Sequence, residues 1–445
     1  MATTAASVRL EKKVQKLKEA IERKHGKTVD QLRLERQQRY HDAATLKTPD
    51  RVPVTIQTGV FACRYAGVPL SAMYYDHVAY WEACLKTVVD FEPDTGGFMM
   101  VGNSGLVNEL LDTRTARWPG GNLPEDVPYQ FVEGEHMTEK EYDLFLSDPS
   151  DFVLRYYLPR TYGAFTPLAN LPPFRDLAGG FITFFIGMLA RPEFREMAEK
   201  IGKSAAEMER VTRTAMELAR LEGELGYPAQ FGRLGGRMGV GGAPFDVVSD
   251  FLRGMRGTML DMYRCPDKLL AACEMIQKWR FDTAMPAELD AQGHPPRVFM
   301  ALHRGSDGFM SKPQFEKFYW PGLKKAIIKA VDLGYDVAPF FEGVWDDRLE
   351  YLLELPKGRV IFWAERTDLV KAKKVLGDHM CIQGGVPPTL LQAATPSEVE
   401  EHVKKLIKTV GKGGGLIVGP GSAMDYARPE NVKAMVDTVK KYGQY

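Results

Sequence analysis

Short apolar runs alternate with longer amphipathic stretches through the C-terminal half of the chain. The apolar runs, which are rich in β-branched and aromatic residues, are 296–304, 336–343, 359–368, 380–386 and 415–422. The stretches that follow them have helical spacing and lie at 314–334, 347–355, 369–377, 395–411 and 428–443. Such alternation predicts parallel βα units. Because the units repeat to the end of the chain, they favour a (β/α)8 barrel over the alternative, a doubly wound sheet.

The first half of the chain shows the same pattern less regularly. The segment 48–56 is a proline-marked entry into a predicted strand, 71–91 a predicted helix, and 96–102 a second predicted strand. Residues 103–175 are rich in proline, glycine and aromatic residues, and 192–222 form a long predicted helix. A stretch as long as 103–175 inside a barrel is typical of an active-site insertion.

The glycine-rich run 233–245 needs a separate interpretation. It contains neither a G-x-G-x-x-G turn opening a helix nor a GK[ST] ending, so a phosphate-binding loop is not indicated. We expect an ordinary flexible loop there.

The N-terminal segment 7–41 is charged and free of proline. Its apolar residues recur at helical spacing, which predicts a helix with a narrow apolar stripe. The stripe consists of Val8, Leu10, Val14, Leu17 and Ile21. We expect a solvated helical arm, with a contact to a second subunit as the alternative. Because the pattern changes at 48–53, we divide the chain into an arm (1–45) and a barrel (46–445), and expect the barrel to fold without residues 1–40.

Charge and cysteine content exclude several classes of protein. The 58 basic residues are balanced by 58 acidic ones, which argues against a nucleic-acid binder and against attraction to anionic membranes. The five cysteines are odd in number and contain no Cys-x-x-Cys, which favours a reducing cytoplasm. The N-terminus lacks the apolar core of a signal peptide. The most apolar run, GGFITFFIGMLA at 179–190, is too short to span a bilayer. We therefore expect a cytoplasmic enzyme, with a homodimer as one option.

Candidate catalytic residues lie where predicted strands end, because barrel active sites form at the C-terminal ends of the strands. Glu342 follows two phenylalanines and is either a metal ligand or an acid whose pKa is raised by an apolar surround; the alternative is an ion pair with Arg348. His303 is a candidate base or ligand, or else a structural hydrogen-bonding group. Glu365 is a second candidate metal ligand, with an ion pair to Arg366 as the alternative.

Further candidates serve substrate binding. Arg51 and Arg64 lie near the first predicted strand and could hold an anionic carboxylate, although surface arginines are the commoner outcome. Asp307, just past His303, is a third candidate catalytic residue. The other candidate substrate-binding residues are Asp94, Gln383 and Ser422.

Five segments carry a resemblance to a known family. They are DRVPV (50–54), PFDVVSDFLRGMRGTMLDMYRCPDKL (244–269), DGFMSKPQFEKFYWPGLKKAI (307–327), TPSEVEEHVKKLI (395–407) and GGGLIVGPGSAMDYARPENVKAMVDTVKKYG (413–443). They resemble the uroporphyrinogen decarboxylase superfamily, which includes porphyrin decarboxylases and methyltransferases that act with corrinoid proteins or coenzyme M. The resemblance covers most of the chain from residue 50 and implies a (β/α)8 barrel.

Two departures argue against decarboxylation of uroporphyrinogen. The decarboxylases carry a loop of the form MRQAGRY after the first strand, whereas this chain reads TGVFACRYAG and keeps only Arg64, Tyr65 and Gly67. Pro420 stands at the position that we align with the histidine of their last glycine loop.

The zinc-binding pattern of the methyltransferases is also altered. Their His-x-Cys-Gly motif aligns with 340–343, so Phe340 and Glu342 replace the histidine and the cysteine, and Ser422 replaces a further cysteine. Zinc prefers imidazole and thiolate ligands in such a site. The resemblance therefore implies a divergent member, closer to the methyltransferase arm than to the decarboxylases.

Three functions remain open at this point. The first is a methyltransferase that demethylates a small methylated or methoxylated compound and passes the methyl group to a corrinoid carried by a partner protein, with a divalent metal such as zinc as an option. The second is a decarboxylase or lyase acting on a small carboxylated substrate. The third is a non-catalytic barrel that binds a ligand.

Overall fold

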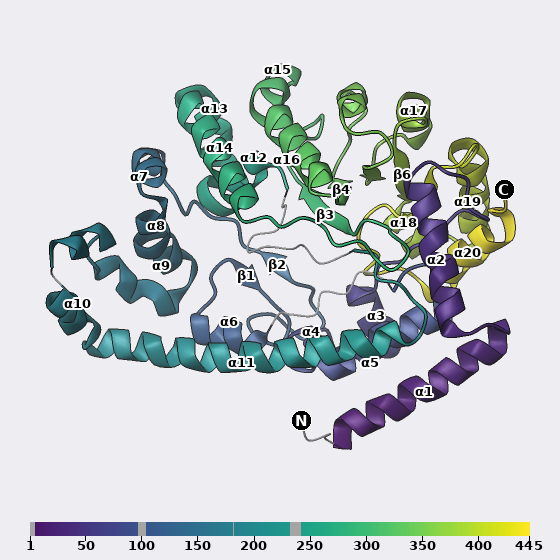
Figure 1. The fold of residues 1–445 in the computed structure, drawn as a ribbon, viewed down its shortest axis with the longest axis horizontal. Helices are drawn as coiled ribbons and strands as arrows, with labels where there is room; N and C mark the ends of the chain where they lie inside the picture. Colours follow the sequence, from purple (N-terminus) through teal and green to yellow (C-terminus); the bar gives the residue numbers. More distant parts are fainter. Residues whose placement is uncertain (1–4, 97–103, 181, 232–241) are drawn as a thin grey trace.

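The computed structural model describes residues 5–96, 104–180, 182–231 and 242–445. Within them, five parallel strands lie side by side in chain order. They are β3 (Arg297–Leu302), β4 (Asp336–Phe341), β5 (Ile361–Ala364), β6 (Cys381–Val386) and β7 (Leu416–Pro420). Helices connect consecutive strands and cover the outer face of the sheet (Figure 1). The alternation predicted from the sequence is confirmed, and this arrangement is that of a (β/α)8 barrel.

The predicted first strand lies beside β7, which extends the barrel wall. Val54 and Val418 form a parallel bridge. The Thr55 amide donates to the Val418 carbonyl at 2.9 Å, and the Val418 amide donates to the Pro53 carbonyl at the same distance. The predicted second strand at 96–102 and the glycine-rich run at 233–245 fall largely outside the described residues.

The outer helices are α14 (Pro266–Asp282), α16 (Trp320–Asp332), α17 (Leu369–Leu376), α19 (Pro396–Val410) and α20 (Pro429–Tyr442). Two of them begin where the sequence indicates a start. Asp368 accepts hydrogen bonds from the first amides of α17, and Thr395 forms a capping box with Glu398 at the start of α19.

Three predicted helices differ in detail. The segment 347–355 is a 3-10 helix, η7 (Leu349–Glu354). The segment 314–334 starts with α15 (Lys312–Gln314) and passes through the π-helical η6 (Phe315–Tyr319) into α16. The segment 71–91 divides at Asp76 into α4 (Ala72–Tyr75) and α5 (His77–Phe91), since the Asp76 side chain accepts the Ala79 amide and starts a new helix.

Strand register defines which side chains share a layer inside the barrel. Ala301, Phe340, Trp363, Gln383 and Ile417 are consecutive partners across the five strands. Aromatic rings fill this layer, for example Phe340 and Trp363 with centroids 5.2 Å apart. Because side chains alternate along a strand, the next inward-facing layer lies two residues further on. That layer is the C-terminal mouth of the barrel.

A long insertion precedes the described C-terminal strands, as predicted. It contains α6 (Gly105–Leu111), the short strands β1 (Ala116–Arg117) and β2 (Gln130–Phe131), and a series of short helices that ends in α10 (Ile182–Leu189). The long α11 (Pro192–Gly223) then runs across the lower part of Figure 1 above α1, with α10 at its left end. No helix among the described residues is long and apolar enough to cross a membrane.

The N-terminal segment is two helices, α1 (Ala5–His25) and α2 (Val29–Ala44), and it is not a solvated arm. On α2, Tyr40 and the two alanines that follow pack against inward-facing residues of the barrel such as Ile361 and Cys381. On α1, Leu10, Val14 and Ile21 are buried against α5 and α11. The expectation of a solvated helix was wrong because the apolar stripe of α1 packs against residues of α5 and α11. The domain boundary at 45 stays a prediction.

Candidate functional site

Three of the predicted site residues lie in the mouth layer on adjacent strands. Leu302 pairs with Phe341, and Phe341 pairs with Ala364, so the residues that follow them, His303, Glu342 and Glu365, are neighbours. His303 Nε2 and Glu342 Oε2 are 3.9 Å apart, and the two side chains are 38% and 48% exposed. This distance is too long for a direct hydrogen bond, and both groups are open to a ligand.

Two buried carboxylates hold His303. Its Nδ1 donates to Asp250 Oδ2 at 2.6 Å, and its backbone amide donates to Asp246 Oδ2 at 3.1 Å. Because Asp250 occupies Nδ1, the other ring nitrogen faces Glu342. The hydrogen bond to Asp250 raises the pKa of His303 above its ordinary value, and the charges of Asp250, Asp246 and Glu342 add to this despite the opposing effect of burial. The arrangement favours an imidazolium that can donate a proton from Nε2.

Burial also raises the pKa of Glu342, an effect that the nearby Glu365 strengthens and His303 opposes. The alternative partner, Arg348, lies elsewhere: its Nε is 3.4 Å from Asp307 Oδ1. Glu342 is therefore a mouth carboxylate without a described arginine or lysine within ion-pair distance.

The backbone of the neighbouring loop orients Glu365. Its Oε2 accepts the Gly343 amide at 2.6 Å and lies 3.7 Å from Arg366 Nε. Gly343 has a φ of +82°, and a Cβ there would come within 2.9 Å of the Ser306 Cβ. The glycine after Glu342 is thus needed for the turn that brings its amide to Glu365.

Sequence reasoning did not single out Asp246 or Asp250. They lie four residues apart on α12 (Pro244–Val247) and the π-helical η5 (Val248–Arg253). Asp246 also accepts the Tyr319 hydroxyl at 2.7 Å and the Arg304 amide at 3.0 Å, and burial raises its pKa to about 6. Two aspartates at this spacing in the apolar run PFDVVSDFL could have indicated them, because an i, i+4 pair shares one helix face.

Arg304 is also bound within this cluster, where carboxylates outnumber cations among the residues that the structure describes. Its guanidinium donates to Ser249 Oγ at 3.0 Å, to Asp250 Oδ1 at 3.0 Å and to Glu133 at 3.3 Å. Glu342 and Glu365 add two further carboxylates at the same mouth. The mouth therefore suits a neutral or positively charged ligand better than a carboxylate.

Two predicted substrate-binding residues lie at the opposite end of the barrel. Arg51 precedes the first strand, and both of its terminal nitrogens donate to Asp94, at 2.8 and 2.7 Å. Asp94 is 1% exposed and also accepts Arg39 Nη1 and the Val54 amide. With Arg39 they form a buried ion-pair cluster that ties α2 to the barrel, away from His303, Glu342 and Glu365.

The other predicted site residues each have different neighbours. The Arg64 guanidinium stacks on the Tyr426 ring at 4.5 Å. Gln383 is buried one layer below the mouth and accepts the Tyr40 hydroxyl at 2.8 Å. Asp307 lines a separate polar cavity beside Arg348.

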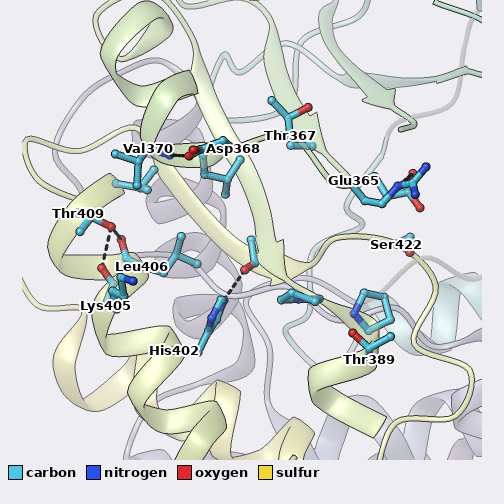
Figure 2. A pocket seen from close by; sticks show the side chains of 17 residues that line it. Glu365, Thr367, Asp368, Val370, Thr389, His402, Lys405, Leu406, Thr409 and Ser422 are labelled. Carbon is cyan, nitrogen blue, oxygen red and sulfur yellow. Dashed lines mark hydrogen bonds and ion pairs between the residues drawn. The ribbon is translucent and has the colours of Figure 1, made fainter. Parts of the chain in front are cut away.

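Ser422 and Glu365 line a further cavity of about 620 Å³ between the loops after β5 and β6 and helix α19. Figure 2 shows it with His402, whose Nε2 is 2.6 Å from the Gly385 carbonyl. The structure thus brings together His303, Glu342 and Glu365. Ser422 shares a cavity with Glu365, whereas Arg64, Asp307 and Gln383 make their described contacts with other residues.

Comparison with known proteins agrees with this architecture. The uroporphyrinogen decarboxylase (URO-D) family model matches residues 236–442, a range that contains Asp246, Asp250, His303, Glu342 and Glu365. These residues make up a little under half of the chain, and the match supports a divergent relative of the uroporphyrinogen decarboxylases. A methyltransferase from Methanosarcina mazei has a similar fold, with a TM-score of 0.51 and 15% identity over 91% of this chain and 98% of that one. At that identity the likeness concerns the fold, and it confirms the barrel.

Curated relatives in the superfamily are uroporphyrinogen decarboxylases, and each match covers only part of them. The protein from Geobacter metallireducens is 29% identical over 216 residues, and that from Trichlorobacter lovleyi is 26% identical over 215 residues. The aligned part covers 60% of each relative and 46% of this chain. A shorter match, 39% identical over 77 residues, covers 21% of the protein from Pseudoalteromonas atlantica.

The donor set does not fit the zinc of the superfamily's methyltransferases. No group of three His, Cys, Asp or Glu side chains that could hold a metal ion occurs in the described part of the chain. Glu342 faces Nε2 of His303, a nitrogen that carries a proton in the imidazolium and then cannot bind a metal. Glu365 accepts a hydrogen bond from the Gly343 amide. The sequence expectation that Glu342 and Glu365 share a metal therefore finds no third ligand among the described residues.

Proposed function

We propose that this chain is a methyltransferase-like enzyme that demethylates a small methylated or methoxylated compound. The observation that carries the proposal is the set of carboxylates around a protonatable His303. In the described part of the chain, a carboxylated substrate would meet Asp250, Glu342 and Glu365, while Arg304 is already bound by Asp250 and Glu133 and Arg366 lies 3.7 Å from Glu365. A neutral ether or a cationic methylated amine meets no such repulsion.

In this proposal His303 is the acid and Asp250 its orienting partner. The bond between the methyl carbon and its heteroatom breaks as the acceptor's electron pair forms a new bond to the carbon. The heteroatom keeps the original pair and takes the proton of His303 Nε2. General acid catalysis of this kind contributes about 10²- to 10⁴-fold to a rate. Glu342, at 3.9 Å from that nitrogen, would stabilise the positive charge of the substrate or of the imidazolium.

The acceptor in the proposal is a corrinoid bound to a partner protein. It rests on the resemblance to the methyltransferase arm and on no contact in the described residues. The decarboxylase alternative is less well supported, because one of the two arginines proposed for its substrate, Arg51, is paired with Asp94 at the other end of the barrel, and the other, Arg64, stacks on the Tyr426 ring.

The test is demethylation of methyl ethers and methylated amines with free cob(I)alamin as acceptor, followed by the appearance of the demethylated product. His303→Gln should lose about 10²- to 10⁴-fold in turnover. His402→Gln, a histidine in the cavity of Figure 2 that does not face Glu342, is the matched control. Undiminished turnover in His303→Gln would contradict the proposal. Release of carbon dioxide from a carboxylated compound, abolished by the same substitution, would instead support the decarboxylase.

A further inference from the structure

Helix α10 exposes an unusual amount of apolar surface. Ile182, Phe184 and Ile186 are 54%, 64% and 57% exposed. Phe174, on the preceding 3-10 helix η4 (Phe174–Gly179), is 40% exposed. The helix itself, ITFFIGML, contains no charged residue. Most exposed hydrophobic side chains on a protein are scattered singly, so a group of this kind indicates an interaction surface.

The other side of α10 is anchored to the molecule. Met188 packs in a small cluster with Leu171 and Phe194, and the Phe185 ring contacts Phe174 with centroids 5.4 Å apart. The helix is therefore apolar on both its anchored and its exposed sides. Helices that are apolar all round are normally buried. Its eight residues span only about 12 Å, too short to cross a bilayer.

The charges that flank α10 decide between a lipid surface and a protein surface. Between residues 171 and 200 there are four basic residues, Arg175, Arg191, Arg195 and Lys200, and four acidic residues, Asp176, Glu193, Glu196 and Glu199. The net charge of this region is zero, so it lacks the basic excess that draws a protein to anionic lipid. An interface between two identical copies places the same patch against itself, and a patch that carries both signs of charge can be complementary to its own copy.

We propose that this chain self-associates through α10, Phe174 and the first turns of α11, with a second copy of the chain as the partner. The partner's α10 covers Ile182, Phe184 and Ile186. Around that apolar centre, Arg191 and Arg195 of each copy meet Glu193 of the other, while Glu196 keeps its ion pair with Lys200 of its own helix at 2.7 Å.

The size of the surface sets the expected strength. Each half-exposed apolar side chain offers on the order of 100 Å², so four provide roughly 400 Å². A standard interface buries about 800 Å² on each partner. The charged turns of α11 must supply the rest, and much of that contact is solvent-exposed. The dimer is therefore expected to be weak, with a dissociation constant on the order of micromolar.

Sedimentation velocity of the full chain across a hundredfold range of concentration tests this proposal. The wild-type protein should shift from monomer to dimer with increasing concentration. The double variant Phe184→Glu, Ile186→Glu should weaken association at least about tenfold, because it places two charges in the apolar centre. Leu353→Glu, which changes a 44% exposed leucine on η7, is the matched control and should dimerise as the wild type does. Circular dichroism verifies that all three proteins are folded.

A wild-type protein that stays monomeric across this range overturns the proposal, as does equal dimerisation of the double variant. Vesicles of phosphatidylcholine and phosphatidylglycerol test the lipid alternative. Binding of the wild-type protein but not of the double variant to these vesicles, without dimerisation, would assign α10 to a membrane surface. The surface lies outside the barrel mouth, so this outcome is independent of the proposed function.

Discussion

His303 depends on three carboxylates that reach it from two parts of the chain. Asp250 and Asp246 come from the helical segment before β3, and Glu342 follows β4. All three raise the pKa of the imidazole. The protonation of His303 is therefore coupled to the ionisation of the carboxylates around it.

Glu342→Gln tests this coupling. Removal of its charge takes away one of the groups that raise the pKa of His303, so that pKa should fall. Activity that needs the imidazolium should then be lost at a lower pH than in the wild type, and KM for a cationic substrate should rise. The measurement is the pH dependence of kcat and kcat/KM. Asp347→Asn, which neutralises an 80% exposed carboxylate of the next loop, should leave both unchanged.

Counting from strand ends predicted some site residues and misplaced others. His303, Glu342 and Glu365 follow their strands and share one layer, as expected. Arg51 precedes its strand, and parallel strands place such residues at the N-terminal face. The order along the chain therefore already argued against a mouth position for it. Asp250 could not be placed by this count, because its helix is not a strand end.

At the element scale, a single carboxylate joins three helices. Glu92, at the C-terminal end of α5, accepts hydrogen bonds from Lys24 at 2.7 Å and from Lys440 at 3.3 Å, and lies 3.0 Å from His25 Nε2. Burial raises the pKa of Glu92, but the hydrogen bonds from α1 and the charge of Lys440 outweigh it and lower that pKa to about 2. Glu92 thus fixes α1 to α5 and α20.

The lowered pKa of Glu92 predicts an acid-sensitive contact. A carboxyl with a folded pKa near 2 and an ordinary value of 4.5 stabilises the fold fully above pH 4.5 and loses that effect as pH falls towards 2. Glu92→Gln should lower the free energy of unfolding by about 1–2 kcal/mol at pH 7, since Lys24 is largely exposed and its share is screened. Urea unfolding at pH 7 and pH 3 checks this. A loss that is as large at pH 3 as at pH 7 would contradict it.

Helix starts were predictable where capping residues mark them, as at Thr395. The helix expected over 314–334 is present and includes a π-helical turn just before Pro321, which has no amide to donate to the preceding turn. The structure passes through η6 at that point. Local sequence determines such starts and breaks, whereas the partners of α1 depend on the distant helices α5 and α11.

At the scale of the whole molecule, α2 closes the N-terminal end of the barrel. Tyr40 is 1% exposed, donates to Gln383, and has the Arg297 guanidinium 4.0 Å from its ring centre. We therefore expect that removal of residues 1–44 prevents cooperative folding, contrary to the expectation from sequence that the barrel folds alone. The apolar stripe over Val8–Ile21 predicted helix α1, but it did not indicate that the Tyr40 side chain packs inside the barrel.

Tyr40→Ala tests the role of α2 without truncation. It should lower the free energy of unfolding by about 3–5 kcal/mol, the usual cost of removing a buried aromatic ring. Tyr263→Ala, at a 74% exposed tyrosine, should change it by less than about 0.5 kcal/mol. Denaturant unfolding of both variants gives the comparison, and equal effects would show that α2 is not part of the barrel core.

The central claim, that Asp250 holds His303 as a proton donor at the barrel mouth, can be tested directly by NMR titration of the histidine side chains. The chain has eight histidines, and His303→Gln identifies the signal of His303. The wild-type pKa should lie above the ordinary 6.5, and Asp250→Asn should lower it because the imidazolium loses its hydrogen-bonded carboxylate. A wild-type pKa at or below 6.5, or one that Asp250→Asn leaves unchanged, would contradict the account.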